Sequence, residues 1–398
     1  MDKLTVEDLD IKGKRVLMRV DFNVPLEGGR VVNDKRIRAA IPTINYITRN
    51  GGKLILMSHL GRPKGKRVPE MSLESCVTVL NALLGRKTKF VEDCIGPDVD
   101  NAVETLGEGE ILLLQNLRYY QQETENDLDF AARLAKLGDV YVNDAFGTAH
   151  RAHASTEGVT HYIDQCAAGY LLMKEIAYLG GVLQYPDKPF VAILGGAKIS
   201  GKIDIISNLL PRVDTIIIGG GMTYTFFKAQ GKEIGKSLLE EDKIELAKEL
   251  LAQGGDKLIL PVDCRVSDTF DFDQRQVGTL KEVAADAIPA DTYGLDIGPQ
   301  STEKFRAIIR AAKTIVWNGP MGVFEIEDTA RGTFAISTAL AEATANGATT
   351  IIGGGDSASA VDQAGVADRI SHVSTGGGAS LEFMEGKVLP GVAALSDR

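Results

Sequence analysis

The chain has 398 residues, which is more than one hydrophobic core usually supports, so two domains are expected. Its formal net charge of -10 argues against general affinity for nucleic acid, and no apolar run is long enough for a signal peptide or a membrane span. The four cysteines are far apart and form no CxxC pair, which indicates neither a zinc site nor a disulfide framework and favours the cytoplasm.

Short β-branched runs alternate with longer helical patterns along the whole chain. In chain order, the expected strands are residues 15–20, 53–57, 111–114, 139–142, 190–194, 215–218, 257–260, 314–317 and 349–352. Helical patterns include residues 73–84, 238–253 and 329–346. Most of the strand candidates are apolar throughout, which is typical of parallel strands covered on both faces. The repeated βα order predicts an α/β fold of doubly wound parallel sheets, whose ligands bind beyond the carboxyl ends of the strands.

The expected domain boundary lies between residues 170 and 189. Residues 170–185 have a helical pattern, and the connector YPDKP comes next, where proline ends the helix. We therefore expect an N-terminal domain at 1–169, an interdomain helix at 170–185 and a C-terminal domain at 186–384.

Basic side chains come after successive strand candidates in the first half. They are His59, Arg62, Arg118, His150, Arg151 and His153, and Arg36 can join them from the helix after the first loop. A guanidinium group offers a planar fork of donors that matches phosphate or carboxylate. A single arginine in a loop is more often solvated, but recurrence after several strands predicts a site for a small polyanion.

Glycine turns come after strand candidates in the second half. They are Gly195-Gly196, Gly219-Gly220-Gly221, Gly353-Gly354-Gly355 and Gly376-Gly377-Gly378. Glycine lets the backbone approach a ligand closely, and exposed amides attract phosphate. One such turn can serve geometry alone, whereas four at one sheet edge predict a nucleotide site.

Three charged residues beside these turns add to that prediction. Lys198 and Lys202 are four residues apart, so we expect both on one face of a helix near its N-terminus. Asp356 comes directly after Gly355, where it can bind Mg²⁺ together with substrate phosphates or can act as the N-cap of the next helix.

Some other features are better explained without a ligand. The segment GKEIGKS at residues 231–237 resembles a phosphate-binding loop, but Gln230 stands where its first glycine is needed and a helical pattern precedes it. Trp317 is expected in the core, and His161 and His372 are expected to be structural.

The ordered motifs VDFNVP, NDKRI, SHLGRP, AFGTAHRAH, AILGGAKISGKI, IIIGGGMTYTF, VWNGPMGVFE, IIGGGDSASA and STGGGASLE resemble those of the phosphoglycerate kinase family across essentially the whole chain. The resemblance implies two Rossmann-like domains joined by a helix and a hinge. It also implies a monomeric, cytoplasmic, hinge-bending glycolytic enzyme, which transfers a phosphoryl group between 1,3-bisphosphoglycerate and MgADP to give 3-phosphoglycerate and MgATP. No nucleic acid or membrane partner is implied. The last residues, about 385–398, are expected to pack back on the first domain.

The same resemblance assigns site residues. Those for 3-phosphoglycerate are Asp21, Asn23, Arg36, His59, Arg62, Arg118, His150, Arg151 and His153. Those for the nucleotide are Lys198, Lys202, Gly219, Asn318, Glu325, Gly353, Gly354, Gly355, Asp356 and Ser357. Glu325 is similar to the ribose contact, Asp356 to the magnesium ligand, and Ser357 stands where some members have threonine.

The expected mechanism depends on charge. A carboxylate acceptor is already ionised near neutral pH, so the site needs no general base and must supply in-line positioning and positive charge. Arg36, Lys198 and Lys202 are expected in this catalytic role. Two alternatives remain: another acyl-phosphate kinase that takes a phosphate-free acid, and a non-enzymatic sensor on a former kinase scaffold. The second would usually lose the lysine, arginine or aspartate positions, and all are present.

Overall fold

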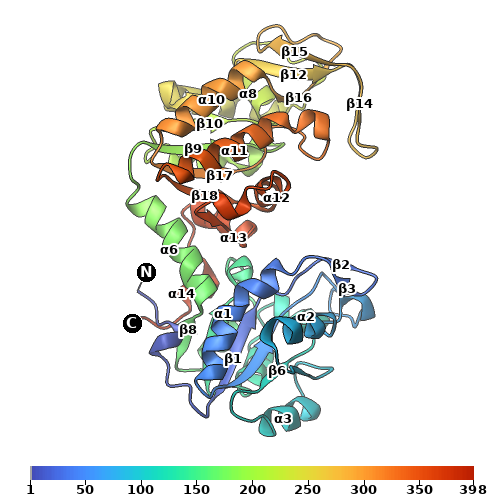
Figure 1. Ribbon diagram of the computed structural model, residues 1–398, viewed down its shortest axis with the longest axis vertical. Coiled ribbons are helices and arrows are strands. Elements are labelled where there is room, and N and C mark those ends of the chain that lie inside the picture. Colours follow the sequence, from blue (N-terminus) through green and yellow to red (C-terminus); the bar gives the residue numbers. More distant parts are fainter. Residues whose placement is uncertain (1) are drawn as a thin grey trace. The chain divides into compact units, whose positions relative to one another are not determined.

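Two six-stranded parallel sheets form the framework of the computed structural model, which describes residues 2–398. The described chain divides into unit 1, which holds residues up to Ala177 together with Val388–Arg398, and unit 2, which holds Tyr178–Lys387. The boundary falls inside the long helix α6 (Tyr170–Gln184). Each unit is described by itself below (Figure 1).

The sheet of unit 1 has the order β5-β6-β4-β1-β7-β8. Its strands are β1 (Arg15–Val20), β4 (Lys53–Met57), β5 (Lys89–Phe90), β6 (Ile111–Leu113), β7 (Val140–Asp144) and β8 (Cys166–Ala168). Its helices are α1 (Lys35–Arg49), α2 (Ser75–Leu84), α3 (Pro97–Glu104), α4 (Gln121–Thr124), α5 (Leu128–Ala135) and α14 (Pro390–Ala393). The helices α1 and α2 pack together over one face of the sheet (Figure 1). A short hairpin, β2 (Leu26–Glu27) with β3 (Arg30–Val31), precedes α1.

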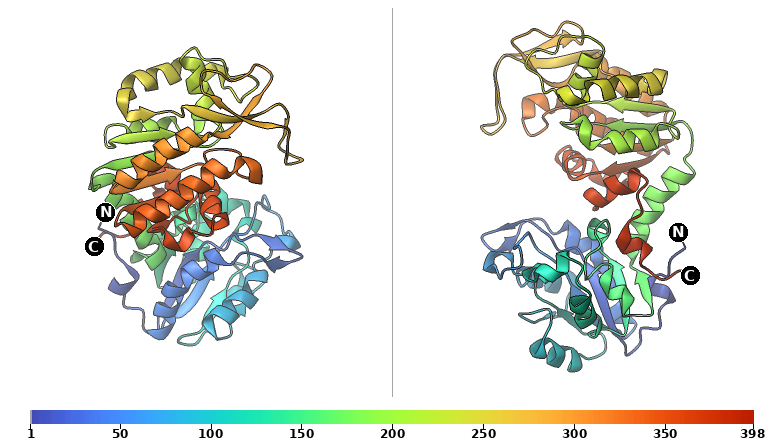
Figure 2. Two further views of the ribbon diagram at one scale, coloured as in Figure 1. Left: turned by 45° about the horizontal axis from the view of Figure 1, so that its top comes forward. Right: turned by 180° about the vertical axis from the view of Figure 1, so that it is seen from behind.

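The sheet of unit 2 has the order β11-β10-β9-β17-β18-β19. Its strands are β9 (Phe190–Leu194), β10 (Thr215–Ile218), β11 (Leu258–Ile259), β17 (Thr314–Asn318), β18 (Thr349–Gly353) and β19 (His372–Val373). Its helices are α7 (Ile203–Leu209), α8 (Thr223–Ala229), α9 (Ile244–Gly254), α10 (Pro299–Ala311), α11 (Arg331–Ala345), α12 (Gly355–Gln363) and α13 (Gly378–Met384). Figure 2 shows further views of both sheets with their helices.

Burial explains why these segments form parallel strands. All five residues of β9 and of β17 are buried, and β1 is buried from Val16 onward. A strand with helices on both faces has no solvent side, so its sequence shows no polar alternation. The predicted doubly wound α/β fold is confirmed, because neighbouring strands in both sheets are parallel and joined by crossovers.

The antiparallel part of unit 2 was not predicted. Its strands are β12 (Asp263–Ser267), β15 (Leu280–Ala284) and β16 (Tyr293–Ile297), with β12 in the middle, and the hairpin β13 (Phe270–Asp271) with β14 (Gln276–Val277) extends from it. These segments mix polar and apolar residues, and the exposed outer strand β15 carries no continuous apolar run. A search for continuous apolar runs therefore finds the parallel strands but not these antiparallel ones.

The helix expected at 238–253 begins later than predicted. The structure has a single 3₁₀ turn at Glu241–Lys243, followed by α9 from Ile244. The carboxylate of Glu240 accepts hydrogen bonds from the backbone N–H groups of Ile199 and Ser200, at 2.6 and 3.2 Å. The backbone of Glu240 is itself extended, with φ -102° and ψ 91°, so the helix does not include it.

The end of the chain belongs to unit 1. Gly391 N donates to Ala149 O at 2.9 Å, and Asn143 Nδ2 donates to Gly391 O at 3.0 Å. At the other end, Lys3 Nζ lies 2.7 Å from a carboxylate oxygen of Asp397. The two terminal segments thus lie side by side (Figure 1).

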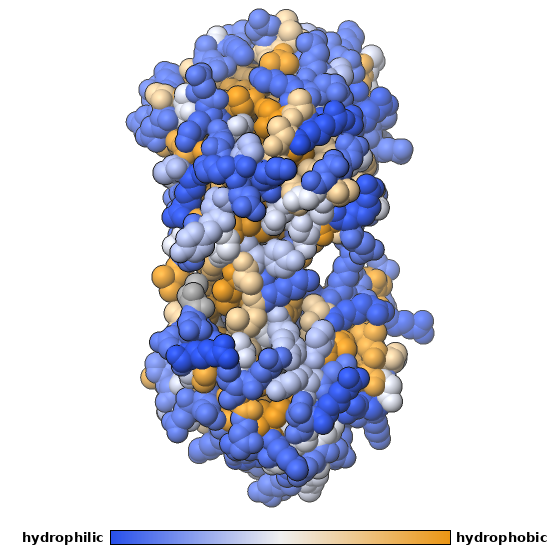
Figure 3. All heavy atoms as spheres, turned by 60° about the vertical axis from the view of Figure 1, so that its left-hand side comes forward, coloured by the Kyte–Doolittle hydropathy of each residue, from blue (hydrophilic) through white to orange (hydrophobic). Residues whose placement is uncertain are grey.

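The surface is mainly hydrophilic on the face that Figure 3 shows. In each unit, hydrophobic side chains form small groups among hydrophilic ones. Among the helices of residues 2–398, none combines the length and the apolar character needed to cross a bilayer.

Candidate functional site

The carboxyl ends of four neighbouring strands bring the polar loops of unit 1 together. Val20 of β1 pairs with Asp144 of β7, Met57 of β4 pairs with Arg19, and Leu113 of β6 pairs with Leu56. The loops after these strands carry Asp21, Asn23, His59, Arg62, Arg118, His150, Arg151 and His153. Arg36 comes from the first turn of α1. The sequence-predicted residues of this half therefore gather at one sheet edge, which we call the basic cluster.

Hydrogen bonds connect these loops. Arg36 donates to Asp21 Oδ2 at 2.8 Å, and Gly61 N donates to Asn23 Oδ1 at 2.9 Å. Arg118 donates to Gly61 O at 2.9 Å. The loops after β1, β4 and β6 thereby hold one another, which limits the ordering that a ligand has to impose.

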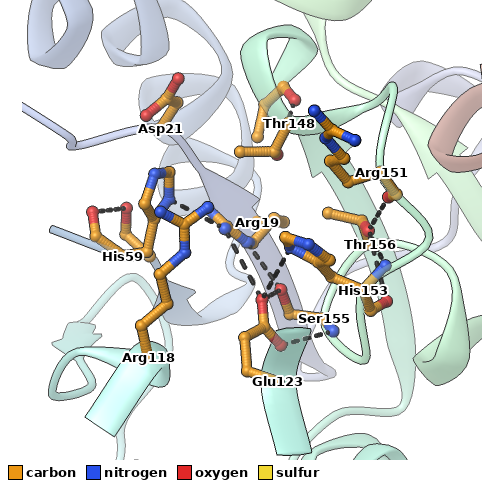
Figure 4. A network of polar contacts seen from close by, with 12 residues as sticks. Arg19, Asp21, His59, Arg118, Glu123, Thr148, Arg151, His153, Ser155 and Thr156 are labelled. Carbon is orange, nitrogen blue, oxygen red and sulfur yellow. Dashed lines mark hydrogen bonds and ion pairs between the residues drawn. The ribbon is translucent and has the colours of Figure 1, made fainter. Parts of the chain in front are cut away.

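A buried polar network lies beneath the basic cluster, and sequence reasoning missed it. Arg19 and Glu123 are both fully buried. Arg19 Nε donates to Ser155 Oγ at 2.8 Å, and Ser155 donates to Glu123 Oε1 at 2.6 Å. A guanidinium nitrogen of Arg19 lies 3.9 Å from Glu123 Oε1 (Figure 4). Arg19 belongs to the apolar strand pattern VLMRV, so only its charge set it apart from core residues.

This network determines how His59 is protonated. An arginine nitrogen can only donate, and Arg19 contacts His59 Nδ1 at 3.1 Å. Nδ1 is therefore the acceptor, and the ring carries its proton on Nε2. Burial, followed by the charges of Arg19, Arg118 and Arg36, holds the pKa of His59 well below its usual value of 6.5. His59 is a neutral donor at physiological pH.

The pKa values of His153 and Arg118 are lowered for the same reasons. Burial, with the nearby charges of Arg19, Arg118 and Arg151, lowers the pKa of His153 to about 4. Burial lowers the pKa of Arg118 to about 10, which still leaves the guanidinium charged at neutral pH. Figure 4 shows both side chains beside His59 and Arg19. The positive charge of the cluster therefore comes mainly from its arginines, since His59 and His153 are both neutral at physiological pH.

The cluster is rich in cations. It contains the guanidinium groups of Arg36, Arg62, Arg118 and Arg151, and that of Arg19 lies beneath them. Arg36 pairs with Asp21, and Arg19 lies 3.9 Å from Glu123. Arg62 and Arg151 are exposed, so they can reach a ligand without leaving a buried position. Such an arrangement suits a small molecule with more than one negative charge.

Unit 2 contains a cavity of about 300 Å³ beyond the carboxyl ends of β9, β10 and β17. Its lining combines glycines of the turns after these strands with Glu325, Asp356 and a set of apolar side chains. The apolar part includes Tyr224, Leu238, Phe270, Phe272, Tyr293 and Val323. Sequence reasoning missed the aromatic residues, most of which come from the unpredicted antiparallel sheet and its hairpin. An apolar cavity with a few polar groups at one end suits a ligand with a ring and a charged tail.

In two of the four turns, glycine is also required for packing between loops, and Gly196, Gly220 and Gly221 of the same turns line the cavity. A Cβ at Gly195 would lie 2.1 Å from Pro320 O, and one at Gly220 would lie 2.5 Å from Gly196 N. Gly219 lies against Met321, whose Sδ would be 2.4 Å from an added Cβ. Glycine is required here because the loops after β9, β10 and β17 contact one another closely.

Each of the other two turns has one open glycine position. An added Cβ at Gly355 or Gly377 would meet no atom within 4 Å. Gly354 has a φ of 88° and precedes the first turn of α12 as its N-cap. The free N–H groups at the start of this nine-residue helix attract an anion. Open space next to these amides leaves room for a phosphate.

Lys198 and Lys202 do not share a helix face, so that expectation is wrong. Lys198 precedes the 3₁₀ turn Ile199–Gly201, and Lys202 is the N-cap residue of α7. Residues four positions apart share a face only inside a continuous α-helix, and here the 3₁₀ turn separates the two lysines. Lys202 nevertheless points to the sheet edge, where its Nζ contacts Asn318 Oδ1. Burial lowers the pKa of Lys202 to about 8, although Asp356 and Glu385 act in the opposite direction.

Asn318 connects this lysine with the α12 turn. It is 1% exposed, and its Nδ2 has no hydrogen-bond partner among the described residues. A Cβ at Gly354 would lie 2.9 Å from that nitrogen. Ser357 lies deeper, where its Oγ accepts a hydrogen bond from Gly319 N at 2.6 Å. A buried unpaired donor beside a helix N-terminus is satisfied when an oxyanion binds there.

The acidic residues near this turn fit one kind of metal site. In residues 2–398, no group of three or more His, Cys, Asp or Glu side chains is arranged to hold a metal ion. Asp356 is an exposed carboxylate in the first turn of α12, not its N-cap. A single carboxylate beside a phosphate position suits Mg²⁺, which keeps several waters and binds through substrate phosphates.

The remaining predicted residues lie at the edges of these sites or in the core. His150 comes after the 3₁₀ turn Phe146–Thr148 and is partly exposed, and Glu325 is exposed at the cavity. Trp317 is fully buried, as expected, and donates to Gly319 O at 2.7 Å. His161 pairs with Glu157 on the surface, and His372 stacks on Tyr178.

Comparisons with known proteins agree with the motifs. The family model described as phosphoglycerate kinase matches residues 6–387. The chain is 57% identical over 400 residues to the phosphoglycerate kinase of Chloroherpeton thalassium and 56% identical to that of Chlorobium luteolum, covering 100% of each chain. Its structure is similar to that of phosphoglycerate kinase from Coxiella burnetii, with a TM-score of 0.88, 40% identity and 98% of both chains covered. It is also similar to phosphoglycerate kinase from Pyrococcus horikoshii, with a TM-score of 0.84, 32% identity and 98% of both chains covered.

Proposed function

The chain belongs to the phosphoglycerate kinase family, and from this membership we propose how its residues divide the work of the reaction. The enzyme is a phosphotransferase of glycolysis that acts on the carboxyl group of 3-phosphoglycerate. It transfers a phosphoryl group between 1,3-bisphosphoglycerate and ADP.

The basic cluster of unit 1 is the proposed site for 3-phosphoglycerate. The many guanidinium groups among few carboxylates support this assignment, since the substrate carries a phosphate and a carboxylate. The neutral His59 donates through Nε2, which adds a directed hydrogen bond without further charge repulsion among the arginines. Asp21 and Asn23 hold Arg36 and the Gly61 loop in place.

The cavity of unit 2 is the proposed nucleotide site. The observation that carries this proposal is the unpaired, buried Nδ2 of Asn318, which lies against Gly354 next to the open position at Gly355, where α12 begins. A phosphate there accepts from this amide and from the N–H groups of α12, and it lies beside the ammonium of Lys202. In this proposal the apolar lining receives the base, and Glu325, which also lines the cavity, accepts a hydrogen bond from a ribose hydroxyl.

The chemistry needs charge compensation more than proton transfer. The acceptor carboxylate of 3-phosphoglycerate is ionised at neutral pH, so no side chain has to remove a proton. Arg36 from unit 1 and Lys198 and Lys202 from unit 2 are the proposed groups that stabilise the negative charge on the transferring oxygens. Because the substrates are assigned to different units, the units must bring them together and exclude water from the acyl phosphate.

The family uses its nucleotide as the magnesium complex. Asp356 is the proposed protein ligand, and the metal when bound neutralises charge on the phosphates. Asp356 also raises the pKa of Lys202, so the carboxylate helps keep that ammonium charged. A cytoplasmic monomer without nucleic-acid or membrane partners remains our proposal.

Exposed arginines allow a test of the site assignment. In an assay of phosphoryl transfer from MgATP to 3-phosphoglycerate, Arg62→Ala and Arg151→Ala should each raise the KM for 3-phosphoglycerate about tenfold, with an unchanged KM for MgATP. The control is Arg133→Ala, an exposed arginine of α5 outside the cluster. Acetate in place of 3-phosphoglycerate should give no turnover, whereas equal turnover would support the alternative acyl-phosphate kinase.

A further inference from the structure

The buried carboxyl group of Asp296 lies in the wall of the unit 2 cavity and has no part in the reaction described above. Asp296 belongs to β16 and is 2% exposed. Its Oδ1 accepts a hydrogen bond from Ile297 N at 2.9 Å, and its Oδ2 accepts one from Gly332 N at 2.8 Å. Gly332 is in the first turn of α11, where backbone N–H groups lack partners within the helix. The carboxylate therefore ties β16 to the start of α11.

Two glycines make room for this carboxylate. An added Cβ at Gly332 would lie 2.4 Å from Oδ1 of Asp296, and one at Gly322 would lie 2.5 Å from the same atom. Both distances are shorter than real Cβ contacts allow, so neither position accepts a larger side chain while the carboxylate stays in place. Gly322 belongs to the loop after β17, which forms one wall of the cavity. The carboxylate thus packs against this wall and against α11 at once.

The start of α11 in turn holds the wall loop. Thr333 Oγ1 accepts a hydrogen bond from Met321 N at 3.0 Å, and Met321 O accepts one from Gly220 N at 2.9 Å. Val323 N donates to Leu295 O at 2.8 Å, next to Asp296 in β16. The residues of this loop that line the cavity are Pro320, Met321, Gly322, Val323 and Glu325. A shift of the first turn of α11 is therefore transmitted to the surface that faces the ligand.

Stability alone does not explain an acid at this position. Burial raises the pKa of Asp296 to about 7, although the N–H groups of Gly332 and Ile297 and the charges of Arg265 and Arg331 act in the opposite direction. Tyr224 and Cys264 also interact with it electrostatically. Removing a carboxylate from water is costly, and a neutral residue would avoid that cost. In its ionised form the side chain supplies what an amide or alkyl residue lacks, namely two acceptors for N–H groups from two different elements.

We propose that Asp296 is a positioning residue for the nucleotide, because its carboxylate fixes the start of α11 and thereby the loop that places Val323 and Glu325 against the base and ribose. The inference rests on the proposed function, in which this cavity holds the nucleotide. It predicts that changes at Asp296 alter nucleotide binding without contact between its side chain and the reacting atoms.

Asp296→Asn is the first test. The amide has the same shape, but its NH₂ group replaces one acceptor and faces a backbone N–H. We expect the Kd of MgADP, measured by calorimetric titration of the whole chain, to rise about tenfold, which corresponds to about 1.4 kcal/mol. The Kd of 3-phosphoglycerate should change by less than about twofold, because its proposed site lies in the other unit.

Asp263→Asn is the matched control. Asp263 is 3% exposed in the neighbouring strand β12, and its carboxylate accepts from Gln300 N at 2.9 Å and Ser301 N at 2.7 Å at the start of α10. It does not line the cavity. Both variants should lower the thermal unfolding midpoint, but only Asp296→Asn should weaken MgADP binding. Equal weakening by both, or a Kd for Asp296→Asn within about twofold of the wild type, would overturn the proposal.

Two more variants keep the outcome interpretable. Thr333→Val removes the acceptor for Met321 N with little change in shape, and it should raise the Kd of MgADP even if Asp296→Asn does not fold. Asp356→Ala tests the nucleotide site itself, because Asp356 lines the same cavity. If Asp356→Ala leaves MgADP binding unchanged, the proposed function fails together with this inference. If Asp356→Ala weakens binding while Asp296→Asn and Thr333→Val do not, only the positioning role is wrong.

Discussion

Replacing Arg36 by alanine should separate the chemical step from nucleotide binding. The Arg36 side chain is 35% exposed and pairs with Asp21 at 2.8 Å. A partly exposed ion pair contributes at most about 1 kcal/mol to folding, so the variant should stay folded. Arg36 also belongs to unit 1, whereas the nucleotide cavity belongs to unit 2. The Kd of MgADP should therefore change by less than about twofold.

The expected loss of turnover is much larger. Removing one donor aimed at charge that develops in the transition state lowers kcat by about 10²–10³, or about 2.7–4 kcal/mol. We expect kcat of Arg36→Ala to fall at least about 100-fold. Arg36→Lys keeps the charge but loses the planar fork, so it should recover only part of the activity.

The assay measures ADP formation from 3-phosphoglycerate and MgATP, with calorimetric titration of MgADP in parallel. Arg38→Ala is the matched control, because Arg38 lies on the same helix and forms an exposed pair with Asp34 at 2.8 Å. The assignment is refuted if Arg36→Ala keeps turnover within about tenfold of the wild type. An equal loss in Arg38→Ala, or a parallel loss of MgADP affinity, would also refute it.

Three further predictions test other parts of the structure. Asp356→Ala should raise the Kd of MgADP at least about tenfold and leave the Kd of 3-phosphoglycerate unchanged. If calorimetry shows weaker binding of 3-phosphoglycerate and unchanged binding of MgADP, Asp356 is not the metal ligand. The pKa of His153 is about 4 when folded and 6.5 when unfolded, so its contribution is present above pH 6.5 and is lost as pH falls toward 4. When the pH falls from 7.5 to 5, protonation of His153 in the unfolded chain should lower the free energy of unfolding by about 2 kcal/mol. Urea titrations of His153→Gln should therefore show a weaker pH dependence than those of the wild type. Gly195→Ala places a Cβ 2.1 Å from Pro320 O and should lower the unfolding midpoint of unit 2, whereas Gly355→Ala in open space should not. Equal midpoints for these two variants would disprove the packing argument.

The parallel sheets were predictable because their strands are buried on both faces. The ranges expected for β1, β4, β9 and β10 are those of the structure, and several others differ by one or two residues at an end. The loops that carry His59, Arg118 and Arg151 come after parallel strands, so their position at one sheet edge was predictable from the fold class alone. The wall of the nucleotide cavity was not predictable in this way, since Phe270 and Tyr293 come from antiparallel segments with mixed polarity.

The sequence by itself determined the fold class, the family and the two groups of residues at the sheet edges, because these depend on local apolar runs and on the residues directly after each run. Only the tertiary structure decided how those residues are paired and charged. Arg19 and Ser155 are 136 positions apart in the chain, and nothing local joins them. Their contact with each other, and that of Arg19 with His59, depends on strand order, and burial then sets which histidines stay neutral. The same holds for Gly195 and Gly220, whose role depends on which backbone lies opposite them.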